Sequence, residues 1–206
     1  MHNFKIDNPT TLHFGKDVMN DLGKTIALYG KKVLLVYGGG SIKKNGIYDK
    51  ALEQLASIGA EVVEFHGIKP NPLVDDVDEA AEMGRKHKVD VILAIGGGSV
   101  IDSAKVISVC IPMQTSAWRV MIGLDKPKKA IPLVAVLTLA ATGTEMNPFA
   151  VVQNEEVNKK IGYGHRLMYP KHSFLDPQNT FTVPKDYTAY GIVDLMAHCL
   201  ENYFGK

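Results

Sequence analysis

The chain has 206 residues, of which 46% are hydrophobic and 22% are charged, as in a soluble globular protein with a sizeable core. Lys and Arg number 23 against 22 Asp and Glu, and this balance argues against a nucleic-acid partner. The longest apolar stretch, residues 130–144, is too short to cross a membrane, and the N-terminus shows no secretory signal. The two cysteines, Cys110 and Cys199, lie far apart, which excludes a disulfide framework and a cysteine-built zinc site. We therefore expect a cytoplasmic protein without membrane association.

Short apolar runs alternate with helical patterns along most of the chain. Phe4, Ile6, Leu12 and Phe14 predict a short pair of extended segments before the first helix. The runs that predict strands are residues 32–37, 61–66, 89–95 and 130–137, and the helical patterns are residues 48–58, 75–88 and a segment that begins at residue 96. This alternation predicts an α/β fold, in which a Rossmann-like parallel sheet has helices on both faces.

Residues 185–204 have no run typical of a strand and predict one long helix. We expect this helix to be the first element of an all-helical region. A single helix cannot bury its apolar face by itself, so we expect the rest of that region to lie beyond residue 206 and the chain to be a fragment of a longer protein.

Glycine clusters follow two of the predicted strands, at Gly38–Ser41 and Gly96–Ser99. A glycine turn between a strand and a helix lets backbone N–H groups approach a phosphate. Neither cluster has the GxGxxG or P-loop spacing, and one cluster alone could equally be a tight turn without a ligand. Two clusters in one sheet favour a ligand site at the strand ends.

Two further patterns are weak when taken singly. Small hydroxyl residues in the segment 138–145 could line a phosphate or a nicotinamide, although an ordinary polar loop explains them better. Asp194 and His198 are four residues apart, so one face of a helix presents both to the same divalent metal. Two ligands are too few for a catalytic metal, and a solvated pair is the simpler explanation.

In their order and spacing, these segments resemble the iron-containing (group III) alcohol dehydrogenase family, and especially its butanol dehydrogenase branch. The resemblance runs from Phe4 to the end of the chain, and three motifs carry it: GGGSxxDxAK at residues 96–105, TLAATGTEMN at residues 138–147, and Asp194-xxx-His198. It implies a dehydroquinate synthase-like architecture, with an α/β dinucleotide-binding domain at residues 1–184. Residues 185–206 would be the first helix of a truncated helical metal-binding domain.

The same resemblance implies roles for individual residues. Gly97, Gly98 and Ser99 would bind the pyrophosphate, and Asp102 would lie beside the nicotinamide. The other cofactor-binding residues would be Gly39, Gly40, Ser41, Asn71, Thr138, Asn147 and Lys160. Asp194 and His198 would be two ligands of Fe²⁺ or Zn²⁺, with two histidines supplied from beyond residue 206. The sequence AATGT at residues 140–144 differs from the AGTGS of many relatives, which leaves the contacts of that loop open.

The residues after the first predicted strand bear on the choice of cofactor. An acidic residue there would bond the ribose 2′-hydroxyl and repel a 2′-phosphate. This chain has the neutral cluster Gly38–Ser41, with Lys43 and Lys44 just after it. That pattern favours NADP(H) over NAD(H).

We therefore predict a metal-dependent NADP(H) alcohol dehydrogenase or aldehyde reductase for primary alcohols and aldehydes such as butanol and butanal. Two alternatives stay open: a glycerol dehydrogenase-like NAD enzyme and a nucleotide-binding fragment without catalysis. We expect weak or absent turnover from this chain alone. The first extended segments offer a sheet edge, so a homodimer or higher homo-oligomer is also expected.

Overall fold

The computed structural model describes residues 3, 5 and 7–205. Its centre is a six-stranded sheet with the strand order β1-β8-β5-β4-β2-β3, in which every pairing is parallel. The strands of this sheet are β1 (Thr11–Phe14), β2 (Lys32–Tyr37), β3 (Glu61–His66), β4 (Val91–Gly96), β5 (Leu133–Leu137) and β8 (His172–Leu175). A separate antiparallel hairpin is formed by β6 (Phe149–Asn154) and β7 (Lys159–Gly164). The expected α/β fold with a parallel sheet is confirmed.

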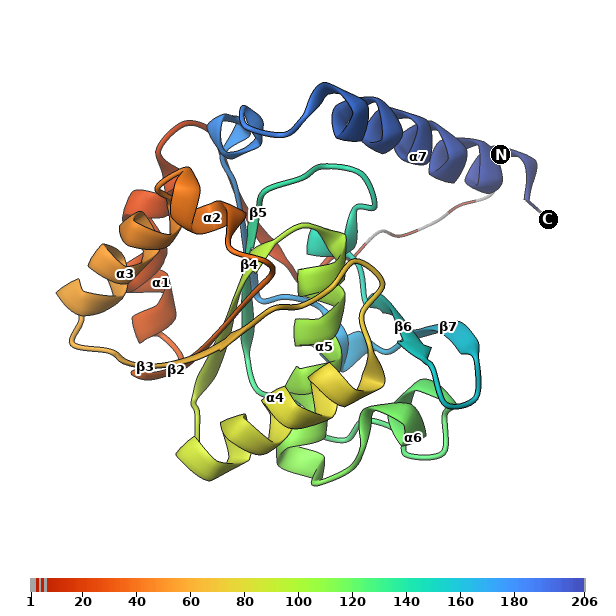
Figure 1. Ribbon diagram of the computed structural model, residues 1–206, viewed down its shortest axis with the longest axis horizontal. Coiled ribbons are helices and arrows are strands. Elements are labelled where there is room, and N and C mark those ends of the chain that lie inside the picture. Colours follow the sequence, from red (N-terminus) through yellow and green to blue (C-terminus); the bar gives the residue numbers. More distant parts are fainter. Residues whose placement is uncertain (1–2, 4, 6, 206) are drawn as a thin grey trace.

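Helices cover both faces of the sheet, as Figure 1 shows with α1 and α3 on one side and α4 and α5 on the other. The helices are α1 (Leu22–Ala27), α2 (Ser41–Lys44), α3 (Ile47–Ser57), α4 (Val74–His87), α5 (Gly98–Met113), α6 (Ala117–Met121) and α7 (Lys185–Phe204). The short 3-10 helices are η1 (Val18–Asp21), η2 (Thr144–Met146), η3 (Arg166–Met168) and η4 (Pro177–Thr180). Each face has its own apolar core, because side chains of successive strand residues point to opposite faces.

The central strands agree with the sequence prediction because they are buried on both faces. Every residue of β4 and β5 is buried, and so is every residue of β2 after Lys32. A strand that is buried on both faces needs apolar residues throughout, and this continuous apolar run is what located the strand in the sequence. β2 and β3 have the predicted bounds, whereas β4 begins at Val91 and β5 only at Leu133.

The expectation of an extended pair before the first helix requires correction. The segment with Leu12 and Phe14 is strand β1, but its partner is β8, about 160 residues later in the chain, and the positions Phe4 and Ile6 lie outside the described residues. In this pairing His172, the first residue of β8, lies opposite Thr11. The four residues of β8 include a His and a Ser, so they lack the apolar run that marks the other strands.

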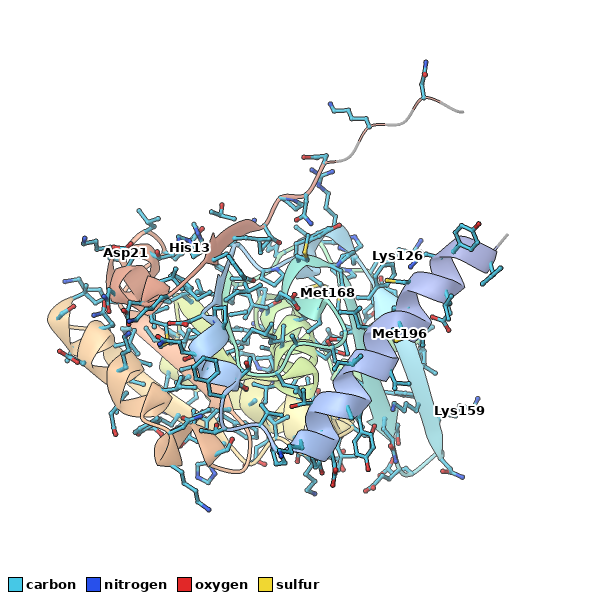
Figure 2. The ribbon with its side chains drawn as sticks, turned by 90° about the horizontal axis from the view of Figure 1, so that it is seen from above. His13, Asp21, Lys126, Lys159, Met168 and Met196 are labelled. Atoms are coloured by element: carbon cyan, nitrogen blue, oxygen red, sulfur yellow. The ribbon has the colours of Figure 1, made fainter. Side chains whose placement is uncertain are left out.

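Helix α7 has the predicted bounds, and most of its surface is exposed. Among its described residues only Gly191 is buried. There the helix approaches the loop after β5, since a Cβ at Gly191 would lie 2.9 Å from the carbonyl oxygen of Ala140. Figure 2 shows α7, with Met196 labelled, lying across the molecule, and Lys159 at the hairpin. Within the described part of the chain, no helix combines the length and apolar character needed to span a membrane.

Candidate functional site

A pocket of about 470 Å³ lies at the carboxyl ends of β2, β4 and β5. From β2 the chain continues to β3 at one edge of the sheet, and from β4 it continues to β5 in the opposite direction across the sheet. The order in which strands are added therefore reverses between the neighbouring strands β2 and β4. Such a switch point is where open α/β sheets bind ligands. Both glycine turns line the pocket, together with Ile42, Asn45, Ile68, Pro70, Ile95, Val100, Thr138, Leu139, Asn179, Thr182, Val183, Pro184 and Tyr187.

The first glycine turn exposes bare backbone to the pocket. Gly40 has a φ of 95°, which disfavours any residue with a side chain. A Cβ added at Gly39 or Gly40 would meet no described atom within 4 Å, so this part of the turn faces open space. Ser41 then begins α2, and both Ser41 and Asn45 line the pocket. The predicted residues Gly39, Gly40 and Ser41 therefore lie together.

The second glycine turn is held tightly against its neighbours. A Cβ at Gly96 would lie 2.6 Å from Val100, and one at Gly98 would lie 3.2 Å from the Thr142 hydroxyl. Gly98 and Ser99 are the first residues of the 16-residue helix α5, so their N–H groups have no acceptor within the helix. The positive end of the helix dipole adds to these donors, which makes this turn a suitable site for a phosphate.

The segment after β5 forms another wall of the pocket. Its first residue, Thr138, donates a backbone hydrogen bond of 3.0 Å to the Gly96 carbonyl. Thr138 and Leu139 line the pocket, whereas Thr144 and Asn147 contact α5. The predicted residues of this segment thus divide between the pocket surface and the layer that supports it.

That supporting layer is organised by Lys105, whose side chain is fully buried. Its ammonium group donates hydrogen bonds to the Thr144 hydroxyl at 2.6 Å, the Asn147 side-chain oxygen at 3.0 Å and the Phe149 carbonyl at 2.7 Å. Burial lowers the pKa of Lys105 to about 8, although the nearby charge of Asp102 opposes this shift. One cation therefore ties α5, the segment after β5 and strand β6 together.

Asp102 belongs to the same buried network. Its carboxylate accepts hydrogen bonds from the Thr144 hydroxyl at 2.5 Å and from the Val151 N–H at 2.8 Å. Burial raises the pKa of Asp102, while these hydrogen bonds and the charge of Lys105 act against that rise. Asp102 and Asn147 are not among the described residues that line the pocket.

Asn71 and Lys160 come together beside the pocket. The Lys160 ammonium donates a hydrogen bond of 2.6 Å to the Asn71 side-chain oxygen. Asn71 has a φ of 60°, a conformation that Asn tolerates better than most residues, and it sits in the turn between Pro70 and Pro72. This contact joins that turn to strand β7, and Pro70 itself lines the pocket.

Asp194 and His198 lie on one face of α7, as their spacing predicts. The Asp194 Oδ2 atom is 3.6 Å from His198 Nε2, and His198 Nδ1 is 3.5 Å from Glu201 Oε2. A carboxylate and an imidazole suit Fe²⁺ or Zn²⁺, so these donors fit a metal site as two of its ligands. Among the residues that the structure describes, no group of three or more His, Cys, Asp or Glu side chains could hold a metal.

Several site residues escaped the sequence prediction. Lys105 lies inside the GGGSxxDxAK motif but was given no role, although it and Asp102 are the only charged residues in α5. A lone Lys in an apolar helix was the signal that could have located it. Asn179, Thr182 and Tyr187 reach the pocket from the C-terminal part of the chain, and no local pattern marks them.

Comparisons with known proteins agree on one family. A family model described as iron-containing alcohol dehydrogenase matches residues 9–177. The chain is 48% identical, over 204 residues, to a probable NADH-dependent butanol dehydrogenase of Bacillus subtilis, covering 99% of this chain and 53% of that protein. It is 38% identical to the NADPH-dependent aldehyde reductase YqhD of Escherichia coli, covering 100% of this chain and 53% of the reductase.

Solved structures give the same result. The crystal structure of an NADH-dependent butanol dehydrogenase from Thermotoga maritima matches with a TM-score of 0.96 and 46% identity. The match covers 99% of this chain and 52% of that chain. The chain thus spans about half the length of the relatives that it matches.

Proposed function

Because the chain belongs to the iron-containing alcohol dehydrogenase family, we propose that it forms the nucleotide-binding half of a nicotinamide- and metal-dependent enzyme that interconverts primary alcohols and aldehydes. The observation that carries this proposal is the pair of glycine turns meeting at the switch point of the sheet. The proposed substrates are small primary alcohols and aldehydes such as butanol and butanal. The proposed partner is a second copy of the chain, because β1 is an edge strand of the sheet.

The chain's own residues would bind and orient the cofactor. The N–H groups of Gly98 and Ser99 would hold the pyrophosphate at the start of α5. The bare backbone at Gly39 and Gly40, with the Ser41 hydroxyl, would hold the adenosine ribose. Thr138 would line the cofactor directly, and Asp102 and Asn147 would act through the network that supports this wall.

Asn71 and Lys160 would close the cofactor site where β7 meets the turn at residue 71. Asp194 and His198 would supply two of the metal ligands. When bound, the nicotinamide would supply or accept a hydride, and the metal would act as a Lewis acid on the alcohol or aldehyde oxygen. The chain's contribution is to place the two groups against each other and to exclude water between them.

For the cofactor, we propose NADP(H), with NAD(H) as the weaker ligand. The first glycine turn has no acidic residue, which supports a 2′-phosphate. The names of the relatives divide, since the 48% identical protein is called NADH-dependent and the 38% identical one NADPH-dependent. We therefore expect this chain to bind NADP(H) only modestly more tightly than NAD(H).

Calorimetric titration of this chain with NADPH and with NADH tests the proposal. We expect both nucleotides to bind. The Gly39→Asp variant should lower the affinity for NADPH by about tenfold or more, while its affinity for NADH should stay within about threefold of the wild-type value. Gly39 has no positive φ and faces open space, so a side chain fits there. Gly39→Asn is the matched control, because it adds the same bulk without charge and should leave the ratio of the two affinities unchanged. A chain that is folded by circular dichroism and binds neither nucleotide would contradict the proposal.

A further inference from the structure

Four side chains form a compact cluster beside the first glycine turn. The hydroxyl of Tyr37 on β2 donates to Glu64 Oε2 on β3, and the hydroxyl of Tyr48 on α3 donates to Glu64 Oε1, both at 2.7 Å. The Lys43 ammonium on α2 lies 4.5 Å from the centre of the Tyr48 ring and 5.2 Å from that of Tyr37. We call these four residues the Lys43 cluster. Four separate elements contribute one residue each.

The Lys43 cluster fixes a positive charge and a negative charge close together. A cation over the faces of two tyrosine rings is attracted to both. Burial alone would raise the pKa of Glu64, but the hydrogen bonds from Tyr48 and Tyr37 and the charge of Lys43 hold it below its usual value. Contact with Tyr37 raises the pKa of Lys43. Both groups are therefore ionised at neutral pH, and their charges offset each other.

The position of Lys43 on α2 separates it from the pocket. Ser41 and Asn45, one helical turn apart, both line the pocket. Ile42 lines the pocket as well, whereas neither Lys43 nor Lys44 is among the described residues that line it. The contacts with the Tyr37 and Tyr48 rings account for the place of the Lys43 ammonium outside the pocket.

We infer that Tyr37, Tyr48 and Glu64 influence cofactor specificity by holding the Lys43 ammonium over the two tyrosine rings, outside the pocket, where it does not add to the binding of a 2′-phosphate. The cluster would thereby limit the preference for a 2′-phosphorylated nucleotide and keep NAD(H) usable. This inference rests on the proposed function, because it concerns the same pocket. In this proposal the first glycine turn accepts a 2′-phosphate, and the Lys43 cluster determines how much more tightly NADPH binds than NADH.

Calorimetric titration of the chain and three variants with NADPH and NADH tests the inference. Glu64→Gln keeps the shape of the side chain but removes its charge, so Lys43 is held less firmly and the ratio of NADPH to NADH affinity should rise about fivefold. Lys43→Met should leave the ratio within about twofold, because the cluster holds Lys43 outside the pocket.

The double variant Glu64→Gln/Lys43→Met separates the two charges of the cluster. If released Lys43 causes the gain, the double variant should lose it, and the gain in Glu64→Gln should shrink at high salt. A gain that persists without Lys43, a loss of NADPH affinity of about fivefold or more in Lys43→Met, or an unchanged ratio in Glu64→Gln would each overturn the inference. Those outcomes leave the proposed function standing, whereas failure of the wild-type chain to bind either nucleotide would overturn both.

Discussion

Lys105 places a full positive charge inside the protein, where it meets three acceptors and the neighbouring carboxylate of Asp102. A buried charge costs free energy unless it is fully paired, and here every donor has an acceptor. The acceptors belong to the segment after β5 and to β6, so the charge positions the wall that Thr138 and Leu139 present to the pocket. Lys105 is therefore a positioning residue rather than one that contacts a nucleotide.

Replacing Lys105 with Met should lower the free energy of unfolding by about 3 kcal/mol, because the largely buried Asp102 and the three acceptors lose their cation. Urea unfolding followed by circular dichroism measures this loss, and Lys86→Met on the exposed face of α4 is the control, expected within about 0.5 kcal/mol. Lys105→Met/Asp102→Asn should recover part of the loss, because it removes both charges. A loss below about 1 kcal/mol in the single variant would show that the network contributes little.

At the level of single residues, the sequence revealed those that stand in recognisable motifs. The glycine turns were found because each follows an apolar strand, and two such clusters in one sheet favour a ligand site at the strand ends. Lys105 was not, because burial of a Lys depends on acceptors that come from residues about 40 positions away. Asn71 and Lys160 were named from family resemblance, and only the fold brings them within 2.6 Å.

At the level of elements, strands β1 and β8 are joined by more than their backbone. His13 Nε2 lies 3.0 Å from His172 Nδ1, and the His13 ring stacks on Phe174 with ring centres 4.2 Å apart. Such a pair needs one acceptor nitrogen, so the two rings cannot both be protonated without losing the hydrogen bond. The edge strand β1 thus has a side-chain contact whose strength depends on pH.

Acidification should loosen this contact. Burial and the charge of His13 lower the pKa of His172 in the folded chain, so the unfolded chain binds more protons as the pH falls below about 6.5. Stability from this pair is present above that value and lost as the pH falls through the lowered pKa. We therefore expect the chain to be less stable at pH 5 than at pH 7, as urea unfolding at the two pH values would show.

The control for this prediction is a variant at another histidine. His172→Gln should flatten the slope of stability against pH, and His87→Gln, at an exposed site on α4, should not. Equal slopes in all three proteins would contradict a role for the His13–His172 pair.

How well an element could be predicted from the sequence depends on how deeply it is buried and on how far along the chain its partner lies. The central strands are continuous apolar runs, whereas four of the six residues of β7 are Lys or Gly, and β8 has only four residues. Both β1 and β8 find their partners far along the chain, and local patterns say nothing about such pairings. Helix α7 was located to its last residue because no proline or strand pattern interrupts it.

At the level of the whole molecule, α7 presents a large apolar surface to solvent. Its exposed apolar residues include Tyr187, Tyr190, Ile192, Val193, Leu195, Met196, Leu200, Tyr203 and Phe204. Contiguous exposed apolar surface of this kind marks an interaction site. The division into domains at residues 184 and 185 remains a prediction, and this surface is where a helical domain would pack.

We expect the purified 206-residue chain to bind a hydrophobic dye and to self-associate at micromolar concentration through α7. Leu195→Lys/Leu200→Lys should reduce both effects several-fold, because it replaces two exposed apolar side chains of α7 with charged ones. Dye fluorescence and light scattering after gel filtration measure them. Val157→Lys is the control, since Val157 is exposed and lies away from α7, between β6 and β7. A monomeric chain that binds no dye would contradict this prediction.

The single buried glycine of α7 has a consequence for the geometry of the two proposed metal ligands. Gly191 sits against the loop after β5, so a tilt of the helix that kept this contact would turn about Gly191 as its pivot. At 1.5 Å per residue, Asp194 and His198 lie only about 5 and 10 Å from that pivot, whereas Phe204 lies about 20 Å away. A tilt of about 10° would then move Asp194 by less than about 1 Å and Phe204 by more than about 3 Å. The far end of α7 can adjust to whatever covers it while Asp194 keeps its distance from the nucleotide pocket.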